Sequence, residues 1–481
     1  MESEQIKNLR AYVVGHPFFK ILLEIAQEAG AEVYLVGGLV RDRLLGRETQ
    51  DWDLTLSQKA LRIARIFAER TGGTFVLLRQ EGETARVVID GRSFDFCKFR
   101  GPDLEGDLRG RDFTINAIGL SLPQAFKPGE WVLVDPLGGI KDLEMGILRM
   151  AGPDCFKQDP LRLLRAFRLS AQLSLTMDPD TRLAVKRWAG NLTESAPERI
   201  HYEWGLLLSQ PDSFDSLNQM DEAGLLEILF PEMGRLKGME QDRYHHLDVF
   251  QHSLLTFQCL EELIQRHILL PIDLDAEISS YLFEDRKEIW LKEAALFHDL
   301  GKGTTKGEKE GHKTFYGHAE ASRNHFASIA QKYRLSHQEK DFVEKIIGYH
   351  MRLLLLSQED RMGHLTRRAM IRFVREGADD LSGHFLLALA DSLAAQGKEK
   401  PKDLEDRLKN LWREALSIRE TLIRPLGKKQ ALVSGRDLIG LGLTPGPLFK
   451  TLLSEIEEAR LDGKISNCEE ALGWVKKRLD P

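Results

Sequence analysis

Short apolar runs and helical patterns alternate over the first 150 residues. Strand-like runs recur at residues 34–36, 51–56, 75–78, 85–89 and 93–99. The first run leads directly into Gly37 and Gly38, a short amphipathic helix follows, and Gly46 ends that helix. Helical spacing also covers residues 16–30 and 58–71. Strands followed by helices that pack on one side predict an α+β domain.

From residue 156 the pattern is helical almost to the end of the chain. Helical spacing recurs in residues 158–169, 194–208, 214–230, 411–423, 448–460 and 467–479. Turn-rich or charged stretches at residues 231–242 and 397–406 separate the helical parts. We therefore expect four parts, which are a head over residues 1–150, a helical neck over 151–240, a histidine-rich helical domain over 241–396 and a helical tail over 397–481.

Asp51 and Asp53 lie two residues apart on the second strand-like run. On a strand they project from one face, about 7 Å apart along the chain. Two carboxylates placed in this way can hold two Mg²⁺ ions about 4 Å apart, an arrangement used for in-line transfer of phosphoryl and nucleotidyl groups. Gly37 and Gly38 leave room for phosphate oxygens to reach backbone N–H groups near a helix N-terminus. Each feature alone fits a solvated strand edge or a tight turn, but together, with Arg41 between them, they predict a nucleotidyltransferase head.

Further polar positions of the head are candidates for the same site. Asp95, on the last strand-like run, is either a third metal-facing carboxylate or a charged residue on the solvent face of its strand. Residues 110–118 are expected to lead into a helix with Arg111, Asp112 and Asn116 near its start. A cation there suits a triphosphate, and a carboxylate or amide suits the hydroxyl groups of a ribose.

A ladder of charged residues marks the start of the helical part. Asp159, Arg162, Arg165 and Arg168 recur at every third position, with apolar residues between them. Residues three apart are neighbours on a helix, so we expect the ladder to face a cleft while the apolar side packs. The alternative is an aspartate that complements the helix dipole and arginines that are only solvated. The strong apolar face beside three arginines favours a functional role.

An aspartate paired with an arginine can select bases without a nucleic-acid template. The edges of cytosine and adenine both present an exocyclic amine beside a ring-nitrogen acceptor, so a carboxylate accepts from one while a guanidinium donates to the other. Uracil and guanine present the opposite order and would leave buried groups unpaired. The ladder therefore predicts selection of C and A.

Imidazoles and carboxylates gather in the third part of the chain. They lie in residues 245–252, 297–302, 316–318 and 348–350 and at Asp391. Such groups on separate helices can converge on one or two transition-metal ions. A lone histidine on a helix is more often structural, but the adjacent His298 and Asp299 form a more specific signal.

Composition narrows the class of protein. The chain has 481 residues, a net charge of −7 and 42% hydrophobic residues, so it is long enough for several domains and carries no global basic field for nucleic acid. Its four cysteines are scattered without a Cys-x-x-Cys pair, which fits a reducing compartment. The N-terminus is polar and acidic, and no apolar run reaches the ~20 residues that a membrane helix needs. We expect a soluble cytoplasmic protein that has no membrane segment.

These motifs, in this order, resemble those of the bacterial tRNA nucleotidyltransferase and poly(A) polymerase family, class II, in the form that carries an HD metal-dependent phosphohydrolase domain. The matching segments are Gly-Gly-x-Val-Arg-Asp, Asp-x-Asp, Arg-Asp-Phe-Thr-Ile-Asn-Ala, Asp-Pro-Leu-Arg-x-Leu-Arg, the His-Asp cluster and Pro-Gly-Pro. The resemblance covers nearly the whole chain. It implies an α+β head with a DNA polymerase beta-like fold, followed by a mostly α-helical body in which residues 241–396 form the HD domain.

The resemblance also implies roles for individual residues. Asp51 and Asp53 would hold the two catalytic Mg²⁺ ions. Nucleotide contacts would come from Gly37, Gly38, Arg41, Arg111, Asp112 and Asn116, and the choice of C and A from Asp159 and Arg162, supported by Arg165 and Arg168. A divalent transition metal in the HD domain would be bound by His252, His298, Asp299 and Asp391, with His318 and His350 as further candidates. The implied substrates are CTP, ATP and the 3′ end of tRNA.

Three departures from the family pattern bear on activity. Gly110 replaces an arginine that usually precedes Arg111, which removes one candidate phosphate contact. Gln158 replaces an acid, so the orientation of Arg162 must rely on another partner. The segment between Phe99 and Arg111 is short, as in family members that add only two C residues, whereas members that add complete CCA carry a longer flexible loop.

The leading hypothesis is addition of complete CCA to tRNA, with an HD phosphohydrolase as a side activity. The alternatives are a CC-only enzyme, a poly(A) polymerase, and a protein whose main activity is an HD phosphodiesterase or phosphatase. The sequence does not predict the oligomeric state.

Overall fold

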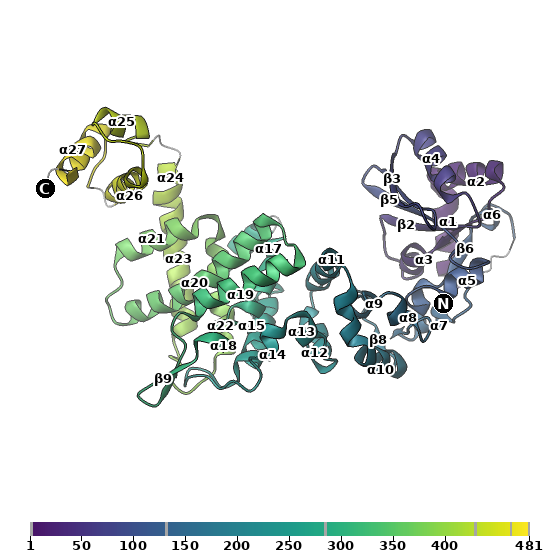
Figure 1. Cartoon of the computed structure of the whole chain (residues 1–481), viewed down its shortest axis with the longest axis horizontal. Helices are drawn as coiled ribbons and strands as arrows, with labels where there is room; N and C mark the ends of the chain where they lie inside the picture. The colour runs from purple at the N-terminus through teal and green to yellow at the C-terminus, as the bar shows by residue number, and fades with distance from the viewer. Residues whose placement is uncertain (1–2, 130–132, 283–285, 428–430, 462–463, 480–481) are drawn as a thin grey trace. The chain divides into compact units, whose positions relative to one another are not determined.

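The computed structural model describes residues 3–129, 133–282, 286–427, 431–461 and 464–479 (Figure 1). The chain forms two compact units, Met1–Pro231 and Glu232–Pro481. Each unit has its own buried hydrophobic residues.

The first unit contains a six-stranded mixed sheet. Its strands are β1 (Val33–Val36), β2 (Asp51–Leu56), β3 (Thr74–Arg79), β4 (Thr84–Ile89), β5 (Arg92–Lys98) and β6 (Gly119–Ser121), in the spatial order β3-β4-β5-β2-β1-β6. The strands β2 and β5 are parallel, and the other neighbours are antiparallel. The expected α+β head is therefore confirmed.

One face of this sheet is covered by helices and aromatic side chains. The covering helices include α2 (Pro17–Ala29) and α4 (Ala60–Thr71). Trp52 of β2 and Phe94 of β5 are buried there with ring centroids 4.4 Å apart, and Phe67 of α4 lies 5.0 Å from Phe94. Since side chains alternate across a strand, the neighbours of Trp52 and Phe94 project from the opposite face. That opposite face carries the aspartates.

The prediction of a helix after residue 110 is wrong. Only a single 3₁₀ turn, η1 (Thr114–Asn116), forms, and the chain then enters β6. β6 pairs with β1 in the register Tyr34↔Ser121, so this segment completes the edge of the sheet. Pairing with a distant strand outweighs the local helical preference.

The short segment between β5 and η1 is compact. It forms helix α5 (Leu104–Arg109), whose first turn is capped by the side chain of Asp103. Leu104 and Leu108 pack against Val36 and Ala117 in a buried cluster. The segment is therefore anchored to the head by apolar contacts.

Helices of the neck follow within the same unit. They include α8 (Cys155–Gln158), α9 (Arg162–Leu173), α10 (Pro179–Trp188), α11 (Pro197–Leu208), α12 (Ser213–Glu222) and α13 (Leu225–Leu229). The expectation that Asp159 shares one helix with the three arginines is wrong, because Asp159 is extended, with φ −146° and ψ 101°, between α8 and α9. Pro160 follows it, and a proline disfavours helical geometry in the preceding residue.

The second unit is helical apart from one short hairpin, β9 (Gly307–Lys309) and β10 (His312–Thr314), over the residues that the structure describes. Its central helices are α15 (Val249–Ile264), α17 (Lys287–Phe297), α19 (His318–Tyr333), α20 (His337–Arg361), α22 (Leu381–Ala394) and α23 (Leu404–Ile418). The helix α15 packs against α17 and α22, and α20 packs against α19. This packing brings residues from five helical segments toward one interior site.

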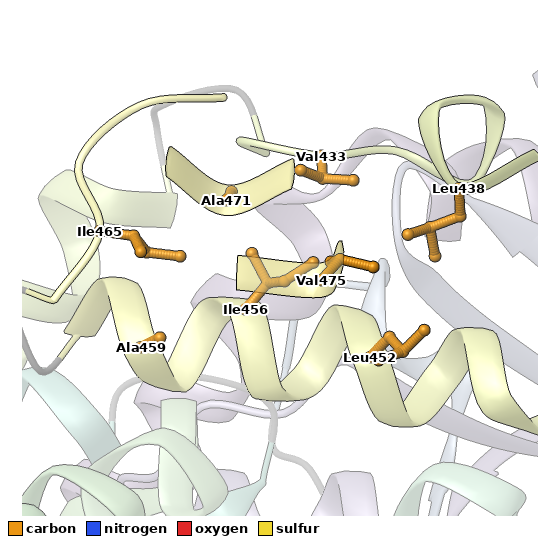
Figure 2. Packing of buried hydrophobic residues seen from close by; sticks show 8 residues of the cluster. All are labelled: Val433, Leu438, Leu452, Ile456, Ala459, Ile465, Ala471 and Val475. Atoms are coloured by element: carbon orange, nitrogen blue, oxygen red, sulfur yellow. The ribbon is translucent and has the colours of Figure 1, made fainter. Parts of the chain in front are cut away.

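The end of the chain has a hydrophobic cluster of its own (Figure 2). It involves α25 (Gly435–Gly440), α26 (Pro447–Leu461) and α27 (Cys468–Leu479). Leu452 and Ile456 of α26 point toward Val475 of α27, and Leu438 of α25 closes one end. The cluster holds these three short helices together as a small module.

Candidate active site and metal centre

Three aspartates share the open face of the head sheet. Asp51 and Asp53 flank the buried Trp52 on β2, and the parallel register places Asp95 of β5 directly beside Asp53. Asp95 therefore lies on the same face as the other two. Arg86 of β4 donates from Nε and Nη2 to the two carboxylate oxygens of Asp95, at 2.7 and 2.8 Å, so this third carboxylate is held by a cation from the protein.

The glycine turn lies against the second of these carboxylates. The N–H of Gly38 donates to Oδ2 of Asp53 at 3.1 Å. Gly37 has φ +67°, and a Cβ there would lie 2.5 Å from the same oxygen. Only glycine fits both requirements without displacing the carboxylate.

Burial raises the pKa of Asp53, and the charge of Asp95 raises it further. Arg111 and the N–H of Gly38 lower the pKa without cancelling these effects. The face therefore concentrates negative charge on carboxylate oxygens, which are the ligands that Mg²⁺ prefers. Asp51, which is exposed, and Asp53 fit such an ion.

A continuous hydrogen-bonded relay joins the head to the neck. Arg41 donates from Nη1 to Oδ1 of Asn116 at 2.7 Å, and Nδ2 of Asn116 donates to Oδ1 of Asp112 at 2.9 Å. Nη1 of Arg165, on α9, donates to Oδ2 of Asp112 at 3.1 Å. Four of the residues expected to contact nucleotide are thus linked to one another.

Glu203 of α11 completes this relay, and the sequence did not point to it. Its two carboxylate oxygens accept from Nε of Arg165 at 3.1 Å and from Nε of Arg168 at 2.6 Å. Glu203 is only 3% exposed, on a helix face that also buries Ile200 and Trp204. An acid among the apolar positions of a helix is the one signal that could have revealed it.

The relay is charged at neutral pH. Burial alone would raise the pKa of the Asp112 carboxyl, but Arg165, Asn116 and Arg162 together hold this pKa well below its usual range. Burial disfavours a charged Arg165, yet Asp112 and Glu203 outweigh that effect and raise its pKa. The guanidinium of Arg165 is therefore fixed between two carboxylates.

The structure does not join the side chains of Asp159 and Arg162. Asp159 accepts from Nη2 of Arg199 at 2.8 Å. Arg162 is 8% exposed, and its guanidinium donates to the backbone carbonyls of Gly110 at 3.0 Å and Cys155 at 3.3 Å. Because Gln158 replaces an acid, Arg162 needs another partner to orient it, and these carbonyls serve that purpose. Oε1 of Gln158 accepts a weaker hydrogen bond from Nη1 of Arg162 at 3.4 Å.

The second unit brings all six expected HD residues together. His252 comes from α15, His298 and Asp299 follow α17, His318 begins α19, and the remaining two are His350 on α20 and Asp391 on α22. Asp299 is central, with Oδ2 3.3 Å from Nε2 of His298 and Oδ1 3.4 Å from Nε2 of His318. Nε2 of His252 lies 2.9 Å from Oδ1 of Asp391.

The orientation of the imidazoles suits metal binding. Nδ1 of His298, His318 and His350 lies 2.9, 2.8 and 2.7 Å from the carbonyl oxygen three residues earlier, so each Nδ1–H donates there, and in the neutral imidazole each Nε2 carries a lone pair. Nε2 of His318 and Nε2 of His350 are only 3.1 Å apart. Two lone pairs at that distance repel unless a cation lies between or beside them. The donor set of imidazoles and carboxylates fits a divalent transition metal.

The titration properties of His252 and His350 agree with that chemistry. Burial lowers the pKa of His252 to about 4 and that of His350 to about 3, so both are neutral at pH 7. Burial also lowers the pKa of His298, but Asp299 outweighs this effect and the net pKa is raised. The Nζ of Lys302 lies 2.6 Å from Oδ2 of Asp299.

The structure adds one histidine to the expected set. His245 can place a ring nitrogen with His252 and Asp391, all within 4.8 Å of one another. The cluster opens into a cavity of about 840 Å³ whose lining includes Lys302, Tyr316, Arg361 and Arg407. The cavity is large enough for a small organic ligand.

Comparison with known proteins assigns the family. Residues 33–149 match the model "Poly A polymerase head domain", residues 174–236 match "Probable RNA and SrmB- binding site of polymerase A", and residues 307–475 match the model for tRNA nucleotidyltransferase domain 2. An A-adding tRNA nucleotidyltransferase of Deinococcus radiodurans is 33% identical over 456 residues, which cover 92% of this chain and 94% of that protein. The chain belongs to the class II tRNA nucleotidyltransferase and poly(A) polymerase family.

A second relative is named for a different activity. A CC-adding tRNA nucleotidyltransferase of Synechocystis sp. is 30% identical over 446 residues, which cover 92% of this chain and 92% of that protein. Among solved structures, the Thermotoga maritima CCA-adding enzyme complexed with tRNA is similar, with a TM-score of 0.59, 22% identity and coverage of 96% of this chain and 94% of that one. This likeness shows a shared fold.

Membership of the family confirms that this nucleotidyltransferase is an enzyme with the head fold that the sequence predicted. None of the three matching models names an HD domain. Among the described residues, no helix is long and apolar enough to cross a bilayer.

Proposed function

We propose that this nucleotidyltransferase extends the 3′ end of tRNA with nucleotides taken from CTP or ATP. The observation that carries the proposal is the open face of the head sheet, where Asp51 and Asp53 lie beside the Gly37–Gly38 turn. Two Mg²⁺ ions bound there would activate the terminal ribose hydroxyl and neutralise the triphosphate. Arg111, whose charge acts on Asp53, would meet the phosphates.

The relay from Arg41 to Arg168 would orient the nucleotide. Arg165 is held on both sides by carboxylates, so its guanidinium offers a fixed donor. Asp159 and Arg162 remain the proposed pair for selecting C and A. To act together, Asp159 must release Arg199, and Arg162 must turn a donor away from the backbone carbonyls. We expect Asp159→Ala to weaken discrimination against UTP and GTP more than it lowers the rate with the preferred nucleotide.

The same enzyme would add only part of the CCA sequence. The segment between Phe99 and Arg111 contains the packed helix α5, in which Leu108 is fully buried. A Cβ on Gly101 would lie 2.8 Å from the carbonyl carbon of Gly106, so the turn has no room for a side chain at position 101. The Deinococcus radiodurans and Synechocystis relatives, each similar over 92% of the chain, are named A-adding and CC-adding, respectively.

A product-length assay tests these statements. tRNA transcripts that end before CCA, or after CC, are incubated with CTP, ATP or both, and the products are sized on a gel. Addition of two C residues to the first transcript, or of one A to the second, supports the proposal and decides between the two activities. Complete CCA on the first transcript would refute the proposal that the enzyme adds only part of the CCA sequence. Long A-tails would indicate a poly(A) polymerase, and no incorporation would refute nucleotide addition altogether.

We infer that the second unit has a separate metal-dependent phosphohydrolase activity. The observation that supports it is the convergence of His252, His298, Asp299, His318 and His350, with three Nε2 lone pairs oriented by backbone carbonyls. A divalent ion held by these residues would supply Lewis-acid activation of water for hydrolysis of a phosphate ester. The protein itself contributes Lys302, an ammonium group beside Asp299, to balance negative charge.

Hydrolysis of a 2′,3′-cyclic nucleotide phosphate tests this second activity. We expect His298→Ala to abolish hydrolysis and to leave nucleotide addition largely intact, whereas the exposed His337→Ala serves as a matched control and changes neither. Equal loss of both activities in His298→Ala would contradict separate sites. Hydrolysis by a wild-type protein that incorporates no nucleotide would make the phosphohydrolase the main activity.

A further inference from the structure

A strongly basic segment follows the helix that carries His350. Residues 361–375 contain five arginines and neither aspartate nor glutamate, in a chain whose net charge is −7. Most of this segment forms helix α21 (Arg367–Gly377). Neither proposed reaction uses these arginines. We call Arg367, Arg368, Arg372 and Arg375 the α21 basic face.

The helix separates its charged and apolar residues sharply. At 100° per residue, the last three arginines of the face fall on one side of the helix. The other side buries Met370, Phe373 and Val374 completely. Arg367, Arg368 and Arg372 are exposed.

Two arginines of this face differ from other arginines in the unit. Arg413 and Arg419 each form two hydrogen bonds to a single carboxylate, those of Asp273 and Glu277. Among the described residues, Arg367 and Arg372 take part in no ion pair. Arg367 and Arg372 are exposed, so their positive charge is available to a polyanion.

We propose that the α21 basic face binds the phosphate backbone of RNA. Charge complementarity favours a polyanion, and guanidinium groups bind phosphate oxygens through paired N–H donors. The face runs roughly 12 Å from Arg367 to Arg375, at 1.5 Å per residue, which is long enough to follow a backbone instead of a single phosphate. A lipid surface fits less well, because the apolar side of the helix is already buried in the protein.

The arginine-rich segment begins at the lining of the HD cavity. Arg361 ends α20 and lines that cavity, and it precedes Arg367 by six residues. Met362, which is exposed, lies between them in the sequence and also lines the cavity. This inference rests on the proposed RNA substrate but not on catalysis at either site.

The test is the salt dependence of tRNA binding by the full chain. A labelled tRNA transcript that ends before CCA is titrated with protein at several salt concentrations, and the dissociation constant is read from fluorescence anisotropy. In the variant with Arg367→Gln, Arg368→Gln and Arg372→Gln, we expect the slope of log K against log salt to become shallower by about 2–3 and affinity near 0.1 M salt to fall about ten-fold or more.

Two further variants make the result specific. The matched control removes three positive charges elsewhere in the same unit, through Arg323→Gln, Arg334→Gln and Lys340→Gln, and should keep a slope close to that of the wild type. Replacing the three α21 arginines by lysine keeps the charge and should restore most of the slope. Loss of slope in the lysine variant would point to disrupted structure and would overturn the inference.

Other outcomes also decide the matter. An unchanged slope in the glutamine variant overturns the inference, as does a loss of binding to vesicles of anionic lipid with unchanged RNA binding. Nucleotide incorporation is measured on the same samples. A shallower slope without any incorporation would support RNA binding by the α21 basic face and refute the proposed transferase activity. Incorporation with an unchanged slope would support the transferase activity and refute RNA binding by this face.

Discussion

Asp112→Asn is the substitution that most directly tests the relay between head and neck. In the wild type, Oδ1 accepts from the N–H of Phe113 and from Nδ2 of Asn116, each at 2.9 Å, and Oδ2 accepts from Arg165 at 3.1 Å. An asparagine has one carbonyl oxygen. Placed at the Oδ1 position, this oxygen keeps two hydrogen bonds and turns the amide NH₂ toward Arg165, where donor meets donor.

The loss can be estimated from these contacts. One hydrogen bond to a charged partner disappears, which costs about 1.5–3 kcal/mol, because Asp112 is buried and water does not replace it. Arg165 keeps its contact with Glu203, so the penalty stays below that for a fully orphaned buried charge. We expect the free energy of unfolding of the Met1–Pro231 unit to fall by about 2 kcal/mol at pH 7. The Michaelis constant for the nucleotide should rise as Arg165 loses its orientation.

The pH dependence gives an independent readout. The pKa of Asp112 in the folded protein lies below its ordinary value of 3.8. Its stabilising contribution is therefore complete above about pH 4 and is lost as the pH falls toward the folded pKa. The difference in stability between wild type and Asp112→Asn should narrow below pH 4.

Urea-dependent hydrogen exchange, read by mass spectrometry on peptides of α9 and α11, reports on this unit separately from the rest of the chain. The control is Asp154→Asn, since Asp154 is exposed and its side chain makes no capping hydrogen bond. Equal protection of α9 in Asp112→Asn and wild type at pH 7, with no change in nucleotide affinity, would refute the reasoning.

Three other substitutions test separate parts of the protein. Gly37→Ala should lower the rate of nucleotide addition at least 100-fold with little change in tRNA binding, because its Cβ would push Asp53 aside in a strained backbone; normal turnover would contradict this. Leu108→Ala should destabilise the head by about 2–4 kcal/mol in thermal unfolding and loosen α5, and a change in the number of nucleotides added would link that segment to the extent of addition. His350→Ala should reduce the metal content of the purified protein and its hydrolysis of cyclic phosphates without affecting nucleotide addition, and undiminished metal content would exclude His350 as a ligand.

Much of the fold was readable from local patterns. The strands predicted in the head, and the helices predicted over residues 16–30 and 58–71, lie close to their observed bounds, because alternation and helical periodicity depend only on neighbouring residues. The break at Asp159 was also readable, since Pro160 restricts the residue before it, but the three-residue spacing of the arginines was given more weight. The helix expected after residue 110 failed for another reason, since pairing with β1 comes from 85 residues away.

The sequence by itself determined the chemistry available to this protein. Two carboxylates on one strand, a glycine turn before a helix and adjacent His298 and Asp299 are local features, and their spacing alone indicates phosphate and metal chemistry. The sequence could not show which side chains lie next to one another in the folded protein. Asp95 could have faced either side of its strand until the parallel register with Asp53 was known.

Only the tertiary structure decided which charges meet. Glu203 binds Arg165 from 38 residues away, and Arg162 is held by backbone carbonyls that no side-chain pattern reveals. The direction of each Nε2 in the metal cluster likewise depends on how its helix packs. The physical reason is that hydrogen bonds are short and directional, so they are set by the packing of distant elements, whereas periodicity is a property of the chain itself.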